Sequence, residues 1–301
     1  MSRFDALDIG LVVATHGRHV MIETPEGRRM LCHPRGKKSD IVVGDRVRWQ
    51  PAGDEGVVEH IETRRNLLFR QDEWRSKSFA ANLDQLIMLV ASEPVFSERQ
   101  LTRALIAASQ ADIPTLIGLN KTDLPAVAAA RERLLPYTKM GVEVIDLAIK
   151  AEPAESLAKL QPRLAGKTTL VIGPSGAGKS TLVNLLVPQA AAQIGEISVA
   201  LGTGRHTTTS TTWYWLDDQR SGALIDSPGF QEFGLRQIEA TALAGLMPDI
   251  AAHLGQCRFN NCTHRQEPAC GVRAALADEH ISESRYRIYQ ELFDELTTRS
   301  W

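Results

Sequence analysis

A glycine-rich octapeptide in the middle of the chain has the residue types needed to bind phosphate. Residues 173–180 read GPSGAGKS and fit the GxxxxGK[ST] pattern of a phosphate-binding loop. Glycines let backbone N–H groups converge on phosphate oxygens, and the start of a following helix adds positive potential. Lys179 would then reach the β and γ phosphates, and the Ser180 hydroxyl would ligate Mg²⁺. The predicted phosphate-binding residues are Gly173, Pro174, Ser175, Gly176, Ala177, Gly178, Lys179, Ser180 and Thr181.

A second motif, Asn120-Lys121-Thr122-Asp123, follows an apolar run and could recognise a base. The Asp123 carboxylate can accept hydrogen bonds from the N1–H and exocyclic amine of guanine. Adenine lacks that amine, so a site built this way discriminates on the order of a thousandfold or more. Asn120 would contact the other edge of the base, and the Lys121 stem would lie along its plane. The tetrapeptide is a weak signal alone, but beside the phosphate loop it predicts GTP as the ligand.

A third motif, DSPG at residues 226–229, ends an apolar strand. Asp226 lies where a second magnesium-directed carboxylate belongs, and the Gly229 N–H can meet the γ-phosphate. Upstream, residues 204–209 read GRHTTT and offer the threonine that would complete the magnesium shell. Any of Thr207, Thr208 and Thr209 could serve, and Thr208 is the working assignment.

The residue after the glycine of DSPG is Phe230, where many GTPases have a glutamine that orients water. Phenylalanine cannot hydrogen-bond a nucleophile, so another group must position it. His206 is the catalytic candidate, because it is polar and titrates near neutrality. The equal alternative is that His206 only packs against a neighbouring loop.

Three of the four cysteines lie close together with a histidine, at Cys257, Cys262, His264 and Cys270. Three thiolates and one imidazole make a closed tetrahedral set for one Zn²⁺, which predicts a structural site and not a catalytic one. His253 is nearby but falls outside this spacing. Cys32 stands alone, and a buried core thiol is the better interpretation for it.

Composition and patterning define the elements that must position these residues. The 301 residues carry a net charge of −2 and are 43% hydrophobic, which is typical of ordinary globular cores in two or three domains. No apolar run reaches the roughly 18 residues that span a bilayer, and residues 1–10 lack the apolar core of a signal peptide. We therefore expect a cytoplasmic protein with no membrane partner, and a monomer.

Hydrophobic patterning divides the chain into three predicted domains. Short alternating runs over residues 1–75 suggest a small β-barrel, with the oligonucleotide-binding (OB) type as the leading candidate. Residues 76–234 alternate strands and helices, which predicts an α/β domain with a parallel sheet. Residues 235–301 are helix-compatible around the cysteine cluster.

The order of the motifs is unusual. The base-recognition motif stands at 120, the phosphate loop at 173 and DSPG at 226, whereas ordinary small GTPases place the phosphate loop first. One sheet can be built from such a circularly permuted chain if the original ends lie close together. DSPG then lies directly before the C-terminal segment.

The segments NKTD, GPSGAGKST, GRHTTT, DSPGF and CRFNNCTHRQEPAC together resemble the ribosome small subunit-dependent GTPase A family of bacteria, over nearly the whole length. The resemblance implies an OB barrel, a permuted P-loop GTPase domain and a helical zinc domain. It also implies a GTPase that binds the small ribosomal subunit and its 16S rRNA, assists late maturation, and couples ribosome-stimulated hydrolysis of GTP to GDP with release. One departure is residues 146–150 (DLAIK), which lack the serine of the family's guanine-supporting loop.

Basic residues and tryptophans are interleaved in and after the predicted barrel, an arrangement that suits RNA backbone and base stacking. From composition alone, solvated surface charge is the simpler interpretation, and the resemblance reverses that preference. The residues are Arg35, Lys37, Lys38, Arg46, Arg48, Arg64, Arg65, Arg70, Trp49 and Trp74. Two other functions stay open: a kinase or ATPase with the same loop, and an RNA-binding assembly factor with a vestigial nucleotide site.

Overall fold

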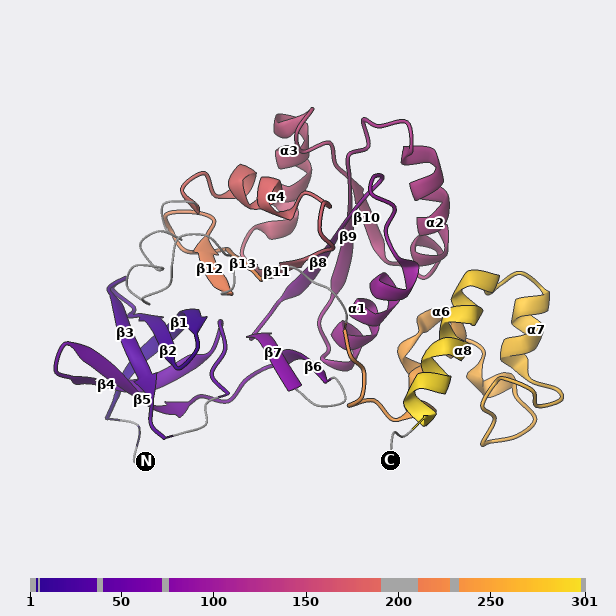
Figure 1. The fold of residues 1–301 in the computed structure, drawn as a ribbon, viewed down its shortest axis with the longest axis horizontal. Coiled ribbons are helices and arrows are strands. Elements are labelled where there is room, and N and C mark those ends of the chain that lie inside the picture. The colour runs from indigo at the N-terminus through magenta and orange to yellow at the C-terminus, as the bar shows by residue number, and fades with distance from the viewer. Residues whose placement is uncertain are drawn as a thin grey trace.

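The computed structural model describes residues 4, 6–36, 40–71, 76–190, 211–227 and 233–298. Figure 1 shows three regions along the long axis: a β-barrel at one end, a central α/β region, and a helical C-terminal region at the other end. Among the described residues, no helix is both long enough and apolar enough to cross a bilayer. Several residues singled out above lie outside the described part: Lys37, Lys38, Trp74, His206, Thr207, Thr208, Thr209, Gly229 and Phe230.

The N-terminal region is a closed five-stranded barrel. Its strands are β1 (Asp8–His16), β2 (His19–Glu23), β3 (Arg29–Pro34), β4 (Arg46–Ala52) and β5 (Glu55–Ile61). They pair in the order β1-β2-β3-β5-β4, and β4 pairs back with β1. Inward-facing side chains form a separate barrel core of Val12, Val20, Ile22, Cys32, Val47, Trp49 and Val58. Cys32 is fully buried there, which confirms it as a core thiol.

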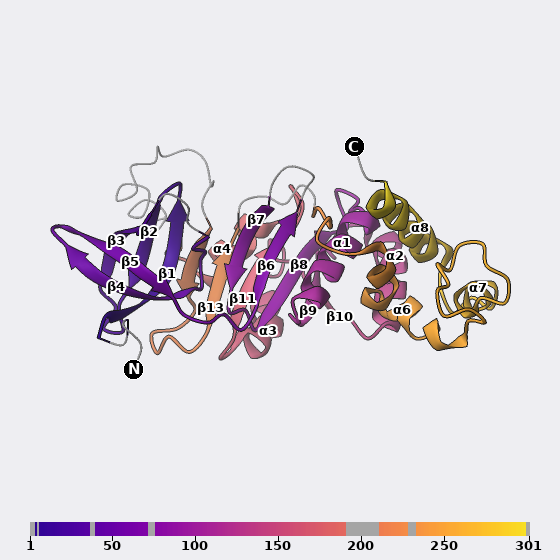
Figure 2. The ribbon, with the colours of Figure 1, turned by 90° about the horizontal axis from the view of Figure 1, so that it is seen from below.

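A two-stranded hairpin of β6 (Leu67–Gln71) and β7 (Ser76–Ala81) follows the barrel. Figure 2, which views the molecule from below, shows the hairpin between the barrel and the C-terminal region. The domain boundaries at 75/76 and 234/235 stay a prediction, and the first of them falls between these paired strands.

The central sheet has the order β10-β9-β8-β11-β13-β12. Its strands are β8 (Gln85–Ala91), β9 (Thr115–Asn120), β10 (Glu143–Asp146), β11 (Thr168–Ile172), β12 (Thr212–Trp215) and β13 (Ala223–Asp226). All neighbours are parallel except β12 and β13. β8 to β10 precede the phosphate-loop strand β11 in the chain, yet β8 pairs directly with β11 and β9 and β10 extend the sheet beyond β8, as a permuted order requires.

Four helices cover the two faces of this sheet. They are α1 (Glu98–Gln110), α2 (Val127–Lys139), α3 (Pro153–Leu164) and α4 (Lys179–Leu186). Alternate residues of β8 belong to two different hydrophobic clusters, one shared with α1 and α2 and the other with α3 and α4. Every residue of β8 is buried, because both faces of this central strand are covered.

The C-terminal region is helical. Its elements are η1 (Ala240–Leu246), α6 (Pro248–Ala251), η2 (Leu254–Gln256), α7 (Gly271–Ala277) and α8 (Glu283–Thr297). Helix α8 begins after Ser282, whose hydroxyl accepts a hydrogen bond from the Arg285 N–H. Its buried apolar side chains belong to the same cluster as those of α1 and α2, so this region packs directly on the central region.

Candidate functional site

The phosphate loop lies between β11 and α4, and close neighbours require glycine within it. A Cβ on Gly173 would lie 2.3 Å from the Leu89 carbonyl oxygen. Gly178, with φ of +100°, precedes α4, and a Cβ there would lie 2.3 Å from Asn120 Nδ2. The loop backbone therefore packs against the ends of β8 and β9 without room for any side chain at these positions.

Asn120 ties the base-recognition motif to the phosphate loop. Its Nδ2 donates to the Ala177 carbonyl at 2.8 Å, and its Oδ1 accepts from the Ile149 N–H at 3.1 Å. The side chain is 4% exposed. One amide proton remains for the edge of a base, so the residue can fix the geometry of both halves of a nucleotide site.

The rest of the motif is anchored through its backbone and its long side chains. Lys121, with φ of +61°, places Nζ 2.6 Å from the Glu93 carbonyl. The Thr122 N–H and hydroxyl both donate to the Leu147 carbonyl at 3.1 Å. Asp123 is exposed, and no described residue donates a hydrogen bond to its carboxylate, which leaves both oxygens available as acceptors.

The loop after β10, which lacks the expected serine, is held by a serine of α3. Ser156 lies on α3, is 1% exposed, and its Oγ accepts a hydrogen bond from the Ala148 N–H at 3.2 Å. Sequence reasoning missed this residue, because α3 was not predicted and the contact spans eight positions.

Lys179 and Asp226 form an ion pair at the other side of the phosphate loop. Their side chains are 12% and 8% exposed, and Asp226 ends β13 next to β11. Ser180 is exposed at the first turn of α4. The structure thus brings these three predicted residues together, whereas His206, Thr208 and Gly229 lie outside the described residues.

The predicted metal ligands converge. One donor atom from each of Cys257, Cys262, His264 and Cys270 lies within 4.8 Å of the others. Cys257 Sγ is 3.4 Å from His264 Nδ1 and 3.9 Å from Cys270 Sγ. Tetrahedral Zn²⁺ bonds of about 2.0 to 2.3 Å would separate ligand atoms by about 3.5 to 3.8 Å, so the donor set and its spacing fit that ion.

The loop that carries the cluster is held by two tyrosines of α8. Tyr286 donates to the His264 carbonyl at 2.7 Å, and Tyr289 donates to the Thr263 carbonyl at 2.8 Å. Glu267 accepts from the N–H groups of Thr263 and Arg265 at 2.7 and 3.0 Å. Burial lowers the pKa of His264, which favours the neutral imidazole that a metal ligand must be.

The barrel does not present its basic and aromatic residues as the sequence suggested. Trp49 is 5% exposed and packs in the barrel core, so the expectation that it stacks on RNA is wrong. An indole fits there because Gly56 opposes it and leaves room. Four of the arginines are engaged in ion pairs: Arg35 with Glu59, Arg48 with Glu62, Arg64 with Asp45, and Arg65 with Asp84.

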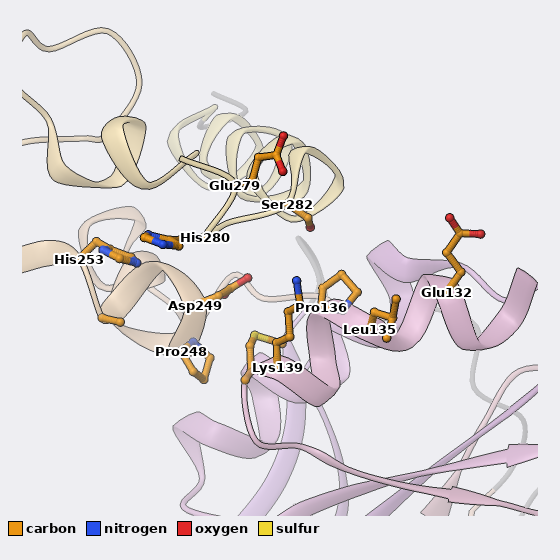
Figure 3. A pocket seen from close by; sticks show the side chains of 12 residues that line it. Glu132, Leu135, Pro136, Lys139, Pro248, Asp249, His253, Glu279, His280 and Ser282 are labelled. Atoms are coloured by element: carbon orange, nitrogen blue, oxygen red, sulfur yellow. The ribbon is translucent and has the colours of Figure 1, made fainter. Parts of the chain in front are cut away.

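The cavity of largest volume described, about 490 Å³, lies away from the phosphate loop. Figure 3 shows it between α2, which contributes Glu132 and Lys139, and the C-terminal region, which contributes Glu279 and His280. His253 stacks on His280 with ring centroids 6.1 Å apart, which confirms that it lies outside the metal-ligand set. Charges of both signs line the cavity, and none of the nucleotide-site residues does.

Comparison with known proteins agrees with this geometry. The family model described as RsgA GTPase matches residues 61–236. The small ribosomal subunit biogenesis GTPase RsgA of Variovorax paradoxus is 59% identical over 293 residues, covering 96% of this chain and 92% of that protein. The protein of the same name from Burkholderia pseudomallei is 51% identical over 289 residues, covering 95% and 91%.

Two crystal structures share the fold along the whole chain. YjeQ from Thermotoga maritima has a TM-score of 0.75 at 31% identity, covering 97% of this chain and 99% of that one. YloQ, a circularly permuted GTPase, has a TM-score of 0.71 at 26% identity, covering 100% and 99%. The predicted permuted fold is confirmed, and the chain belongs to the RsgA GTPase family.

Proposed function

We propose that this protein is a GTP-hydrolysing enzyme that acts in biogenesis of the small ribosomal subunit. One observation carries the proposal: Asn120 joins a guanine-recognition motif to a phosphate loop 57 positions away through a 2.8 Å hydrogen bond. The relatives with 59% and 51% identity are named small ribosomal subunit biogenesis GTPases, which supports the cellular role.

Asp123 selects guanine. Its exposed carboxylate accepts no hydrogen bond from the described residues, so it can take the N1–H and the exocyclic amine of the base. Asn120 holds the phosphate loop and offers its second amide proton to the base. The backbone N–H groups of residues 173–181 cradle the phosphates.

Binding of GTP and Mg²⁺ would break an existing ion pair and give each of its two members a new partner. Lys179 and Asp226 neutralise each other in this structure. The phosphates of GTP attract Lys179, and the freed Asp226 carboxylate and the Ser180 hydroxyl are suited to hold Mg²⁺. In this proposal Thr208 would complete the Mg²⁺ ligands, the Gly229 N–H would meet the γ-phosphate and His206 would position the water.

The Cys257-Cys262-His264-Cys270 cluster holds one Zn²⁺ with a structural role. Four protein ligands fill a tetrahedral shell and leave no position for water or substrate. Zn²⁺ bound by these four residues would fix the loop that carries them, and it would supply no chemistry to hydrolysis.

The barrel contributes RNA contacts, with 16S rRNA of the small subunit as the partner, and the protein acts as a cytoplasmic monomer. Hydrolysis stimulated by the subunit drives release from it. The names of the relatives support a small-subunit partner, and the barrel architecture suits RNA contacts.

The test is GTP turnover by the full chain with and without isolated small ribosomal subunits, with ATP as the competing nucleotide. We expect turnover of GTP only, raised by the subunit. Lys179→Ala should abolish it, while Lys139→Ala, an exposed lysine on α2, should not change it. Asp123→Asn should shift preference toward xanthosine triphosphate, because xanthine carries a carbonyl where guanine carries its amine.

Each contrary outcome has a definite meaning. Equal turnover with and without subunits would remove the ribosomal partner and leave a GTPase. Use of ATP would overturn the role of Asp123. Nucleotide binding without turnover under both conditions would favour an RNA-binding assembly factor with a vestigial site.

A further inference from the structure

A small cavity of about 250 Å³ lies where the barrel meets the central sheet. Strand β1 contributes Ile9 and Leu11, the end of β2 contributes Glu23 and Pro25, and β12 contributes Trp215. Ile9 is 45% exposed, the only large apolar side chain among the described barrel residues with such exposure. The volume of the cavity is below the usual 300–1,000 Å³ of pockets for drug-sized ligands, so the cavity suits one flat ring system.

The polar floor of the cavity is assembled and rigid. Glu23 is 5% exposed and accepts from Trp215 Nε1 at 2.8 Å and from Arg29 Nε at 3.2 Å. These bonds hold the indole ring in the wall. The carboxylate keeps further lone pairs, so it can also accept from the amine or ring N–H of a base.

Two arginines, Arg46 and Arg220, stand at the mouth of the cavity. No described residue forms an ion pair or hydrogen bond with the side chain of Arg46, which is exposed. Arg220 lies 3.4 Å from Glu23 and is 38% exposed. A Cβ on Gly27 would lie 2.0 Å from Arg220 Nη2, so the turn after β2 leaves the space that this guanidinium occupies. Arg46 thus differs from Arg35, Arg48, Arg64 and Arg65, each of which is paired with a carboxylate.

We propose that this cavity binds one unpaired nucleotide of RNA, with its base between Trp215 and Ile9 and its phosphate on Arg46. An aromatic wall, a buried acceptor and a free cation at the mouth are the three groups that single-stranded RNA recognition uses. The proposal rests on the proposed function, because it specifies where the RNA partner is held. It places the contact at the seam between barrel and sheet, and it uses Arg46 alone among the arginines that the sequence singled out.

The experiment measures binding of the full chain to a fluorescently labelled single-stranded RNA 12-mer by anisotropy, over a range of salt concentrations. Arg46→Ala should weaken binding about fivefold and reduce the log–log salt slope by about 0.7, the value for one lost phosphate contact on a single strand. Arg35→Ala, which removes an exposed but paired barrel arginine, should leave both quantities unchanged.

A second pair of variants tests the cavity itself. Ile9→Asp places a negative charge at its mouth on an exposed side chain and should weaken binding about tenfold. Leu135→Asp makes the same change on α2, where the side chain is 53% exposed, and should have no effect. A 12-base-pair RNA duplex, whose bases are paired, should bind the wild-type chain less tightly than the single strand.

Equal effects of Arg46→Ala and Arg35→Ala, or equal affinity for duplex and single strand, would overturn the proposal. So would variants that bind the 12-mer normally but bind small ribosomal subunits weakly, since a protein would then occupy the cavity. Basal GTP turnover is measured alongside and should be unchanged. If small ribosomal subunits did not stimulate GTP turnover by the wild-type chain, the proposed function would be contradicted. The RNA-binding measurements would still test the cavity separately.

Discussion

The two ends of the molecule are attached to the GTPase domain in different ways. The barrel encloses a core of its own, and its buried members of the large hydrophobic cluster are Val13, Ala14, Met21 and Val43, with the partly buried Leu11 and Leu31 packed against that cluster. Its backbone meets the central sheet at one residue pair, Ala14 and Thr212. The C-terminal region has no separate cluster among its described residues, and its buried side chains share one with α1 and α2. The barrel can therefore hold its shape alone, whereas the C-terminal region depends on its neighbour and, in our proposal, on Zn²⁺ at the cysteine cluster.

Buried charges reinforce the C-terminal attachment. Arg285 on α8 is 2% exposed and reaches both Asp249 oxygens, at 2.8 and 3.0 Å, and Thr102 Oγ1 on α1 at 2.6 Å. Arg103 on α1 is equally buried and donates to the Phe233 carbonyl at 2.7 Å and to Glu295 of α8. Removing one partner from such a network destabilises the fold strongly, because it leaves a buried charge without its counter-charge.

Removing the metal should give the largest difference between the two ends. Structural zinc contributes on the order of 10 kcal/mol in small domains, so a chelator should unfold residues around the cluster and weaken the packing of α8. The barrel should be unaffected. Hydrogen exchange with and without chelator measures both ends at once. An equal loss of protection in the barrel would contradict the claim that only the C-terminal region depends on metal.

Asp249→Ala should have the next largest effect. It leaves the Arg285 guanidinium buried without its carboxylate, which should lower the free energy of unfolding by about 3–5 kcal/mol. The double variant Asp249→Leu with Arg285→Met should recover most of that loss, because no uncompensated charge remains. Urea denaturation measures both. A double variant as unstable as the single one would show that the packing, and not the charge, is responsible.

A matched pair of core truncations tests whether destabilising each end also destabilises the central region. Ile22 in the barrel and Ile281 before α8 are 0% and 1% exposed, and each isoleucine-to-alanine change should cost about 2–5 kcal/mol. Ile22→Ala should destabilise the barrel alone and leave GTP affinity unchanged. Ile281→Ala should destabilise α1 and α2 as well, because they share its cluster. Site-resolved hydrogen exchange distinguishes the two patterns.

The smallest expected effect is a pH dependence confined to the barrel. Burial, with a further contribution from Glu55, raises the pKa of Cys32 to about 12, against about 8.5 in an unfolded chain. The folded barrel favours the protonated thiol of Cys32. The contribution of Cys32 to stability is therefore complete below about pH 8.5 and declines as the pH rises toward 12. Cys32→Ala should remove this part of the decline. Barrel exchange rates between pH 8 and 11 measure it, and identical profiles would contradict the assignment.

Strong local signals allowed the main elements to be predicted from sequence. The apolar run Leu86–Ala91 has the pattern of a buried strand and is part of β8, and Ser97, a favoured N-cap residue type, caps α1 by accepting from the Gln100 N–H. Strand β3, the β6–β7 hairpin, helix α3 and strand β12 were not predicted. β12 is only four residues long, and its place is fixed by pairing with β13 and β1, which is a tertiary effect.

The nucleotide site was predicted by residue type more fully than by geometry. Motif spacing indicated Lys179, Asp226 and Asn120, but only the fold shows that Asn120 bridges Ala177 and Ile149. Trp49 shows the opposite case. An aromatic residue beside arginines looks like an RNA contact in the sequence. In the structure, the alternation of side chains along β4 points Trp49 into the barrel, and no local sequence pattern shows which face of the strand lies inside.

The pairing of β12 with β1 has a consequence for the solubility of the folded chain. β12 is the outermost strand of the central sheet on that side, and an uncovered edge strand is a template for pairing with another molecule. The barrel pairs with part of that edge, at Ala14 and Thr212, so at this point the sheet of eleven strands continues into a closed cylinder. The barrel thus protects the GTPase domain against intermolecular strand addition, in addition to any role in binding.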